Sequence, residues 1–260
     1  MQFRTLFSPL ALSLLVVLPA ACARAPSADG TYDPIEPVNR AMHGVNKGLD
    51  TVIVRPASKV YGTVLPEPLR QGISNVGDTL DLPGVVLNQI LQARIEDATN
   101  NTLRLAVNVT AGIGGLFDVA SVLQLPKTDA DFGETLAVWG VGEGPYIELP
   151  VFGPSNLRDT VGIAADMAMN PLNNVFEDDD ATAVLGIEAA SRLNSRYRYS
   201  DTVDSILYES ADSYSQLRLL YLQNRRHQIA KSKGGEGDAA ADGDFIDPYQ
   251  DSGFIDPYED

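Results

Sequence analysis

Residues 131–159 read DFGETLAVWGVGEGPYIELPVFGPSNLRD, and the interpretation of the whole chain depends on this stretch. It contains five glycines, three prolines and the only tryptophan, Trp139. Glycine costs about 1 kcal/mol and proline about 3 kcal/mol inside a helix, so no helix of useful length fits residues 140–154. The stretch is also rich in apolar and aromatic side chains, unlike a linker. It must therefore pack against protein or lipid.

Four charged residues lie near the two ends of this stretch: Asp131, Glu134, Arg158 and Asp159. They fit two roles. They can form ion pairs that fix the fold, or they can contact a polar group such as a lipid headgroup. We favour the structural role, and keep the headgroup contact as the alternative.

The composition bounds the class of protein. The chain has 260 residues, a net charge of −16 and 44% hydrophobic residues, which is enough for a packed core. A strongly acidic chain argues against nucleic acid, because neutralising phosphates requires lysine and arginine. Residues 231–260 contain nine acidic residues and two lysines, and the sequence FIDPY occurs twice, starting at residues 245 and 254. We predict a disordered acidic tail there, either without function or carrying a docking peptide.

The N-terminus is typical of an exported protein. Residues 1–21 combine a basic Arg4 with a short apolar run, and they predict a signal peptide rather than a membrane span. The only cysteine, Cys22, follows directly and is the expected site of lipidation. Pro19 occupies the position where bacterial lipoproteins normally have leucine, so cleavage to a soluble periplasmic protein is the alternative. Ala23 rather than aspartate favours the outer membrane.

The apolar periodicity predicts several helices. The first starts at Asp33 or Glu36 and runs to about residue 52, with an apolar face that contacts either the core or a membrane. Gly112, Gly114 and Gly115 are expected to end a helix with a sharp turn. The remaining helices are predicted over 69–80, from Pro83 onward, 95–109, 117–122, 157–169, 178–193 and from Ser200 onward. By propensity alone, 136–141 and 146–152 form a hairpin that turns at 142–144.

No catalytic chemistry is apparent. The two histidines, His43 and His227, belong to no recognisable metal or nucleophile pattern. The chain has no G-x-S-x-G elbow of an acyl hydrolase. We therefore expect no enzyme, no metal and no cofactor.

The stretch D-F-G-x-T-L-x-x-W/Y-G-V-G-x-G-P-Y-x-x-L-P-x-x-G-P-S-x-L-R-D resembles the signature block of the MlaA (VacJ) family of bacterial outer-membrane lipoproteins. Two further motifs agree with that resemblance: D-P-I-E-P-x-N-R-x-M from Asp33, and D-x-Y-x-x-x-R-x-x-Y-x-Q from Asp212 to Gln223. The resemblance covers residues 33–229. It is far more specific than a short motif, because nearly thirty residues match in order.

The resemblance implies an all-α fold: one mostly helical, ring-like domain over residues 32–230 with irregular Gly/Pro-rich segments. Residues 22–31 would be a lipidated N-terminus and linker. For residues 136–152 it favours helical and irregular structure over the hairpin. It also supplies candidate channel or signature residues, which are Asp131, Phe132, Gly133, Trp139, Gly142, Pro145, Tyr146, Pro154, Arg158 and Asp159.

The function implied by the resemblance is phospholipid transport. Such a protein would be lipid-anchored in the outer membrane, facing the periplasm. It would take mislocalised phospholipid from the outer leaflet through an amphipathic channel and pass it to a periplasmic MlaC-like carrier. Trimeric porins would be its neighbours, and no cofactor would be needed. The alternatives are a porin-associated structural lipoprotein without transfer activity, and a lipid hydrolase.

Overall fold

The computed structural model describes residues 31–170, 172 and 178–234. The predicted signal peptide, Cys22 and residues 235–260 of the acidic tail lie outside the described residues. The fold is mostly helical, as predicted, with one short hairpin. The helices are α2 (Glu36–Leu49), π-helix η2 (Asp50–Val54), α3 (Arg55–Val64), α4 (Glu67–Leu91), α5 (Ile95–Thr110), α6 (Val119–Val122), α7 (Phe132–Val138), α8 (Leu157–Met169), α9 (Asp178–Arg198), α10 (Ser200–Asp204), π-helix η4 (Ser205–Glu209) and α11 (Ser213–Ser232).

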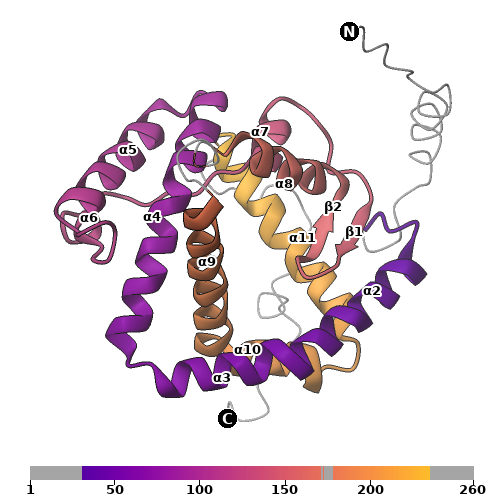
Figure 1. Cartoon of the computed structure of the whole chain (residues 1–260). Coiled ribbons are helices and arrows are strands. Elements are labelled where there is room, and N and C mark those ends of the chain that lie inside the picture. Colours follow the sequence, from indigo (N-terminus) through magenta and orange to yellow (C-terminus); the bar gives the residue numbers. More distant parts are fainter. Residues whose placement is uncertain (1–30, 171, 173–177, 235–260) are drawn as a thin grey trace, which may run out of the picture.

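The helices follow one another around a closed circuit (Figure 1). Helices α2 and α3 form one side, α4 the next, and α7 with α8 the third, while α11 returns to α2. Helices α5 and α6 lie outside α4, and α9 lies on its other side, packed against both α3 and α4. The hairpin, β1 (Tyr146–Leu149) with β2 (Gly153–Asn156), lies beside α11.

The first helix is longer than predicted. It continues without a break through η2 into α3 and ends at Val64. Pro56, in the first turn of α3, has no N–H to donate, and the wide π-turn of η2 comes directly before it. Such bulges accommodate a local mismatch in the hydrogen-bond ladder, which explains why the chain bends rather than stops.

Two predicted helix boundaries are wrong. Helix α4 runs through Pro83 instead of starting there, because packing against α5 on one side and α9 on the other outweighs the intrinsic cost of proline. The helix predicted from Ser200 breaks between η4 and α11. There Asp212 caps the new helix by accepting a hydrogen bond from the amide of Ser215 at 3.2 Å.

The hairpin predicted from propensity is half right, and the helical and irregular structure that the resemblance favours over residues 136–152 is wrong for the strand 146–149. Residues 136–141 form no strand, since Asp131 caps α7 through the amide of Glu134 (2.8 Å) and the helix runs to Val138. Residues 146–149 do form a strand, but its partner is 153–156, and Val151 in the turn has φ +69°. The helix over 157–169, the start of α9 at Asp178 and the glycine turn after α5 are confirmed.

No helix among the described residues is both long enough and apolar enough to cross a membrane.

Candidate functional site in the polar interior and on the apolar exterior

The distribution of side chains is the reverse of a typical soluble domain. In the described part of the chain, twenty-two polar or charged residues are buried against eight hydrophobic ones, and four of those eight are alanines. Conversely, twenty-nine large hydrophobic residues are exposed. Isolated exposed apolar residues are ordinary, but a continuous apolar exterior marks a surface that contacts lipid or protein.

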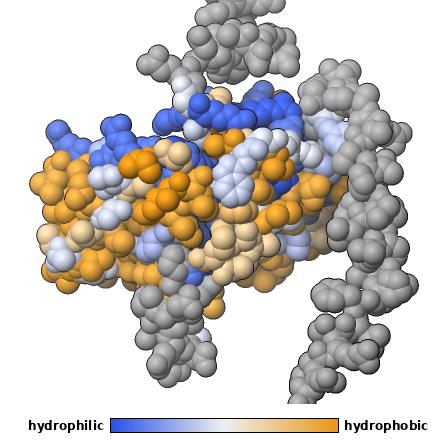
Figure 2. Space-filling view, turned by 90° about the horizontal axis from the view of Figure 1, so that it is seen from above, coloured by the Kyte–Doolittle hydropathy of each residue, from blue (hydrophilic) through white to orange (hydrophobic). Residues whose placement is uncertain are grey.

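Figure 2 shows where these side chains gather. The molecule viewed from above is a slab with hydrophilic residues along one long edge, whereas hydrophobic residues cover most of the rest of the visible face. A band of this kind is a candidate surface for contact with lipid or with another protein.

Helices α2 to α3 show the reversal most clearly. Val38, Val45 and Val52 recur at intervals of seven and are 61%, 53% and 74% exposed. The opposite side of the same helix buries Asn39 and His43. The amphipathic pattern predicted from the sequence is therefore present, but its polar face is the one directed inward. Of the two alternatives, contact of the apolar face with the protein core is wrong.

The charged residues of the signature meet at Arg225 of α11. This guanidinium donates to Asp131 (2.6 and 2.7 Å), to Asp159 (2.8 and 3.1 Å) and more weakly to Glu134 (3.4 Å). Every N–H of Arg225 is engaged, since Nη1 also donates to Gln228. Bidentate pairs of this kind are strong and fix orientation. Three elements, α7, α8 and α11, are thereby joined at one point.

The electrostatics follow from burial and pairing. Burial and the neighbouring Asp131 raise the pKa of Glu134 to about 7. Burial works in the same direction on Asp159, but hydrogen bonds from Arg225 and Tyr221 outweigh it and hold the pKa of this carboxyl below its usual range. Arg158 adds a further pair with Asp159 at 3.1 Å. The arrangement agrees with the structural role favoured from the sequence.

A second polar cluster fixes the hairpin to α2. Asn39 donates to the carbonyl of Tyr146 (3.0 Å) and accepts from the amide of Glu148 (3.0 Å), so one side chain completes the edge of β1. The Tyr146 hydroxyl donates to Glu148, whose carboxylate also lies 3.4 Å from His43. His43 is thus a buried structural residue, and Tyr146 is one of the most buried side chains in the described part.

The other candidate residues lie apart from these clusters. Phe132 and Trp139 stack edge to face, and Trp139 is 55% exposed with its indole N–H donating to the carbonyl of Leu91. The carbonyl of Pro145 accepts from the amide of Leu157, which starts α8. Gly142 has open space beside it. The structure therefore brings together Asp131, Gly133, Pro154, Arg158 and Asp159 of the candidates, and leaves Trp139 and Gly142 at the surface.

A pocket of about 240 Å³ opens beside the Arg225 cluster. Its walls come from the start of α7, from β2, α8 and α11. Carboxylates, a guanidinium and amides share the lining with apolar surface, and its principal members are Asp131, Asp159, Ile163, Asp166, Tyr221 and Arg225. Asp131, Asp159 and Pro154 of the sequence prediction are among the lining residues.

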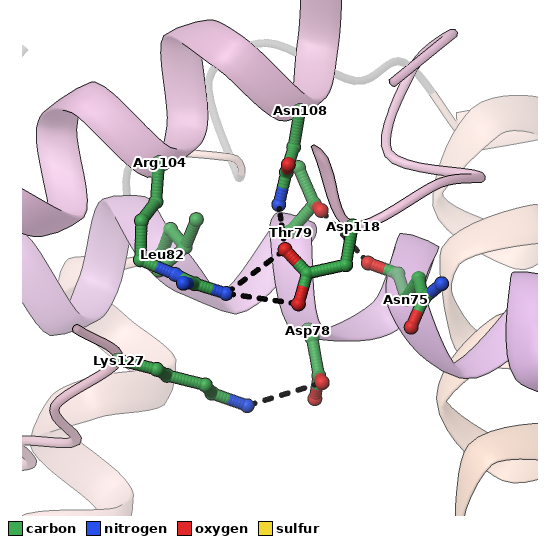
Figure 3. A pocket seen from close by; sticks show the side chains of 8 residues that line it. All are labelled: Asn75, Asp78, Thr79, Leu82, Arg104, Asn108, Asp118 and Lys127. Carbon is green, nitrogen blue, oxygen red and sulfur yellow. Dashed lines mark hydrogen bonds and ion pairs between the residues drawn. The ribbon is translucent and has the colours of Figure 1, made fainter. Parts of the chain in front are cut away.

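A smaller pocket, shown in Figure 3, is a structural ion cluster. Arg104 donates to both oxygens of Asp118 at 3.0 Å, Asn108 donates to the same carboxylate, and Lys127 pairs with Asp78. Its volume of about 10 Å³ is roughly that needed for one water molecule, so no lipid fits there. The cluster ties the loop after α5 back to α4 and α5.

Comparison with known proteins identifies the relatives of this chain. The profile of the MlaA lipoprotein family matches residues 31–228. The chain belongs to this family. It is 34% identical over 231 residues to the intermembrane phospholipid transport system lipoprotein MlaA of Escherichia coli K12, covering 87% of this chain and 89% of that protein. An uncharacterized protein of Rickettsia bellii is also 34% identical, over 203 residues and 78% of each chain.

The fold agrees with a solved structure. A chain from work on the structural basis for maintenance of bacterial outer membrane lipid asymmetry superimposes with a TM-score of 0.65 and 30% sequence identity. The match covers 76% of this chain and 98% of that one. The named relatives of the MlaA lipoprotein family are components of a transport system, and the family is non-enzymatic.

Arg225, the central residue of the signature cluster, is not among the site residues that the sequence predicts. The family motif from Asp212 to Gln223 includes Arg218, and Arg225 lies seven residues further along the same helix. Seven residues are two helical turns, so both arginines point to the same side of α11. That spacing was a usable signal: Arg218 pairs with Asp33 at 2.7 Å, just as Arg225 pairs with Asp159.

Proposed function

We propose that this MlaA-family lipoprotein removes mislocalised phospholipid from the outer leaflet of the outer membrane and passes it to a periplasmic carrier. Lipid asymmetry of that membrane would thereby be maintained. The observation that carries the proposal is the reversed distribution of side chains: an apolar exterior suited to acyl chains surrounds a polar interior. The named relatives, components of intermembrane phospholipid transport systems, support the same reading.

The physical reasoning concerns where the protein sits. The exposed valines of α2 and α3 and the apolar face in Figure 2 would lose contact with water inside a leaflet, which stabilises the embedded state by about 25 cal/mol per Å² buried. The polar edge would remain in the aqueous periplasm. A path through the ring would let a headgroup move in polar surroundings while the acyl chains stay in apolar ones.

The proposal also covers how the chain is anchored to the membrane and which proteins it contacts. Acylation of Cys22 would hold the chain on the membrane, since two or more acyl chains anchor stably. A trimeric porin would be its neighbour in the outer membrane, and an MlaC-like protein would receive the lipid. Transfer of this kind needs no cofactor, because its direction follows from the relative affinities of donor and acceptor for phospholipid.

The decisive experiment measures outer-leaflet phospholipid in cells that lack the gene and are complemented with wild type or Cys22→Ala. Deletion should raise surface phospholipid, and wild type should restore the low level. Restoration by both versions would support transport but remove the lipid anchor. An unchanged phospholipid level on deletion would refute the proposal and favour the structural, porin-associated alternative. Release of fatty acid by the purified protein would instead indicate a hydrolase.

A further inference from the structure

The pocket of about 240 Å³ beside Arg225 is large enough for a small polar group, and its chemistry selects a class of ligand. Its volume is below the roughly 300–1,000 Å³ of pockets that enclose a drug-sized ligand. A headgroup fragment therefore fits, whereas a whole phospholipid does not.

The pocket excludes an anionic ligand. Arg225 is the only cationic residue in the lining, and its N–H groups are all taken by carboxylates and by Gln228. No donor of this guanidinium is left for a phosphate. The lining contains three aspartates, so with Arg225 its formal charge is −3 + 1 = −2. A phosphate would meet net repulsion without a charge-assisted hydrogen bond from Arg225 to compensate for it.

The same lining offers acceptors. Each oxygen of Asp166 accepts one hydrogen bond, from Asn88 (2.8 Å) or from the amide of Phe132 (3.0 Å), and a carboxylate oxygen has room for two. The side chain of Asp131 is 42% exposed despite its pair with Arg225. Asp159, by contrast, is surrounded by donors. Asp131 and Asp166 are thus the two carboxylates that can still accept from a ligand.

Apolar and aromatic surface completes the pocket. Ile163, Pro154 and the ring of Tyr221 lie in the same lining as the carboxylates. A short alkyl segment packs against such surface, and a cation is attracted to the face of a tyrosine ring. The lining therefore matches a group that carries a positive charge and N–H donors at the end of a short carbon chain.

We propose that this pocket binds the primary ammonium group of an aminophospholipid headgroup, through Asp131 and Asp166. The two-carbon linker lies against Ile163 and Tyr221, and the acyl chains remain on the apolar exterior. This inference rests on the proposed function and adds to it a substrate class, namely lipids with an ethanolamine-type headgroup. The structure thereby assigns part of the family signature to headgroup selection as well as to folding.

The test uses the full lipoprotein purified in mild detergent and incubated with an equimolar mixture of phosphatidylethanolamine, phosphatidylcholine and phosphatidylglycerol. Lipid retained by the protein is quantified by mass spectrometry. We expect ethanolamine lipid to be enriched about tenfold over glycerol lipid, as for one charge-assisted hydrogen-bonded contact. Phosphatidylcholine should not be enriched to that extent, because its ammonium has no N–H to donate.

Two variants and a control define the site. Asp166→Asn removes one carboxylate, and Asn224→Lys places a cation at an exposed position of the lining without touching the Arg225 cluster. Both should abolish the enrichment, and the second keeps the test valid if the first fails to fold. Asp201→Asn, an exposed acid of α10 outside the pocket, should leave it unchanged.

Several outcomes would overturn the proposal. Equal retention of the three lipids by wild type, or enrichment that survives in both Asp166→Asn and Asn224→Lys, would show that the pocket does not select the headgroup. Competition by free ethanolamine at equal concentration would indicate an amine site unrelated to lipid. Asp166-dependent cross-linking of a lysine from the periplasmic carrier, without lipid enrichment, would indicate a protein contact. Restoration of lipid asymmetry in cells is a separate readout, so the proposed function can stand when this inference fails.

Discussion

Gly162 of α8 and Gly133 of α7 are in direct backbone contact: a Cβ placed on Gly162 would lie 2.5 Å from the amide nitrogen of Gly133 and 2.8 Å from its Cα. A Cβ on Gly133 would in turn lie 2.5 Å from Oδ1 of Asp159. These two glycines let α7 and α8 approach closely enough for Asp131 and Asp159 to reach the same arginine. The glycine of the signature block is thus a packing requirement of the ion cluster.

Gly162→Ala should destabilise the protein by at least about 2 kcal/mol, because the new methyl group meets backbone atoms that cannot move independently. Gly186→Ala is the matched control: it lies within α9 with nothing within 4 Å of its Cβ position. Alanine there should stabilise the helix by roughly 0.5–1 kcal/mol. Urea unfolding monitored by circular dichroism measures both. Equal effects of the two substitutions would contradict the packing role of Gly162.

Arg225→Ala should cost about 3 kcal/mol, the lower end of the range for breaking a buried ion pair, because Asp159 loses one guanidinium partner but keeps Arg158. Arg226→Ala is the control on the next residue, since Arg226 is 46% exposed and pairs with Glu143 at the surface. Exposed pairs contribute at most about 1 kcal/mol, so this variant should unfold close to wild type. Thermal unfolding in detergent compares them. A small effect of Arg225→Ala would mean that the cluster does not hold α7, α8 and α11 together.

The sequence predicted the helical segments better than it predicted their environment. The limits of α8 and the start of α9 follow from apolar periodicity and from proline and aspartate at the ends, which are local signals. The same periodicity on α2 shows that Val38 and Asn39 lie on different faces, but not which face is buried. In this protein the polar face of α2 is the buried one, and only the contacts of Asn39 with β1 reveal it.

The ion pairs of Arg225 cannot be predicted from local sequence, for a different reason. Asp131 and Arg225 are 94 residues apart, and nothing in either neighbourhood specifies the other. The helix start predicted at Pro83 is wrong for the opposite reason. The local signal of proline is strong, but the packing of α4 against α5 and α9 outweighs it. The resemblance to the family supplied Asp131 and Asp159 as candidates, whereas their common partner came only from the fold.

Stability should fall as pH rises from about 4.5 to about 7 through the contribution of Glu134. Burial raises the pKa of this carboxyl from 4.5 to about 7, so the folded state holds a proton that the unfolded state has released. The protonated Glu134 contributes its full stabilisation, on the order of 2 kcal/mol, below the unfolded-state pKa of 4.5. This contribution is lost as the pH rises to the folded-state pKa of about 7. Glu134→Gln should flatten this slope.

The measurement for Glu134 is the urea midpoint at half-unit steps from pH 4.5 to 8. Glu67→Gln, an exposed change of the same kind in the first turn of α4, serves as the control and should keep the wild-type slope. Burial and nearby carboxylates also raise the pKa of Asp81, to about 6. Asp81 therefore acts in the same direction, and Glu134→Gln should keep a smaller decrease of stability with pH. A rise in stability over this interval that disappears in Glu134→Gln would contradict the assignment.

Val52→Asp tests the apolar exterior without disturbing the interior. Val52 is 74% exposed, so its replacement should change the unfolding free energy by less than about 0.5 kcal/mol. If this face lies among acyl chains, losing the burial of a valine and placing a charge there should lower partitioning into phospholipid vesicles at least about tenfold. A chain beginning after Cys22 should be used, so that lipidation does not mask the difference. Gln216→Asp, an exposed polar position of α11, adds the same charge elsewhere and should float with vesicles as wild type does. If Val52→Asp floats equally well, α2 and α3 contact something other than lipid, and a protein partner on this face becomes the better explanation.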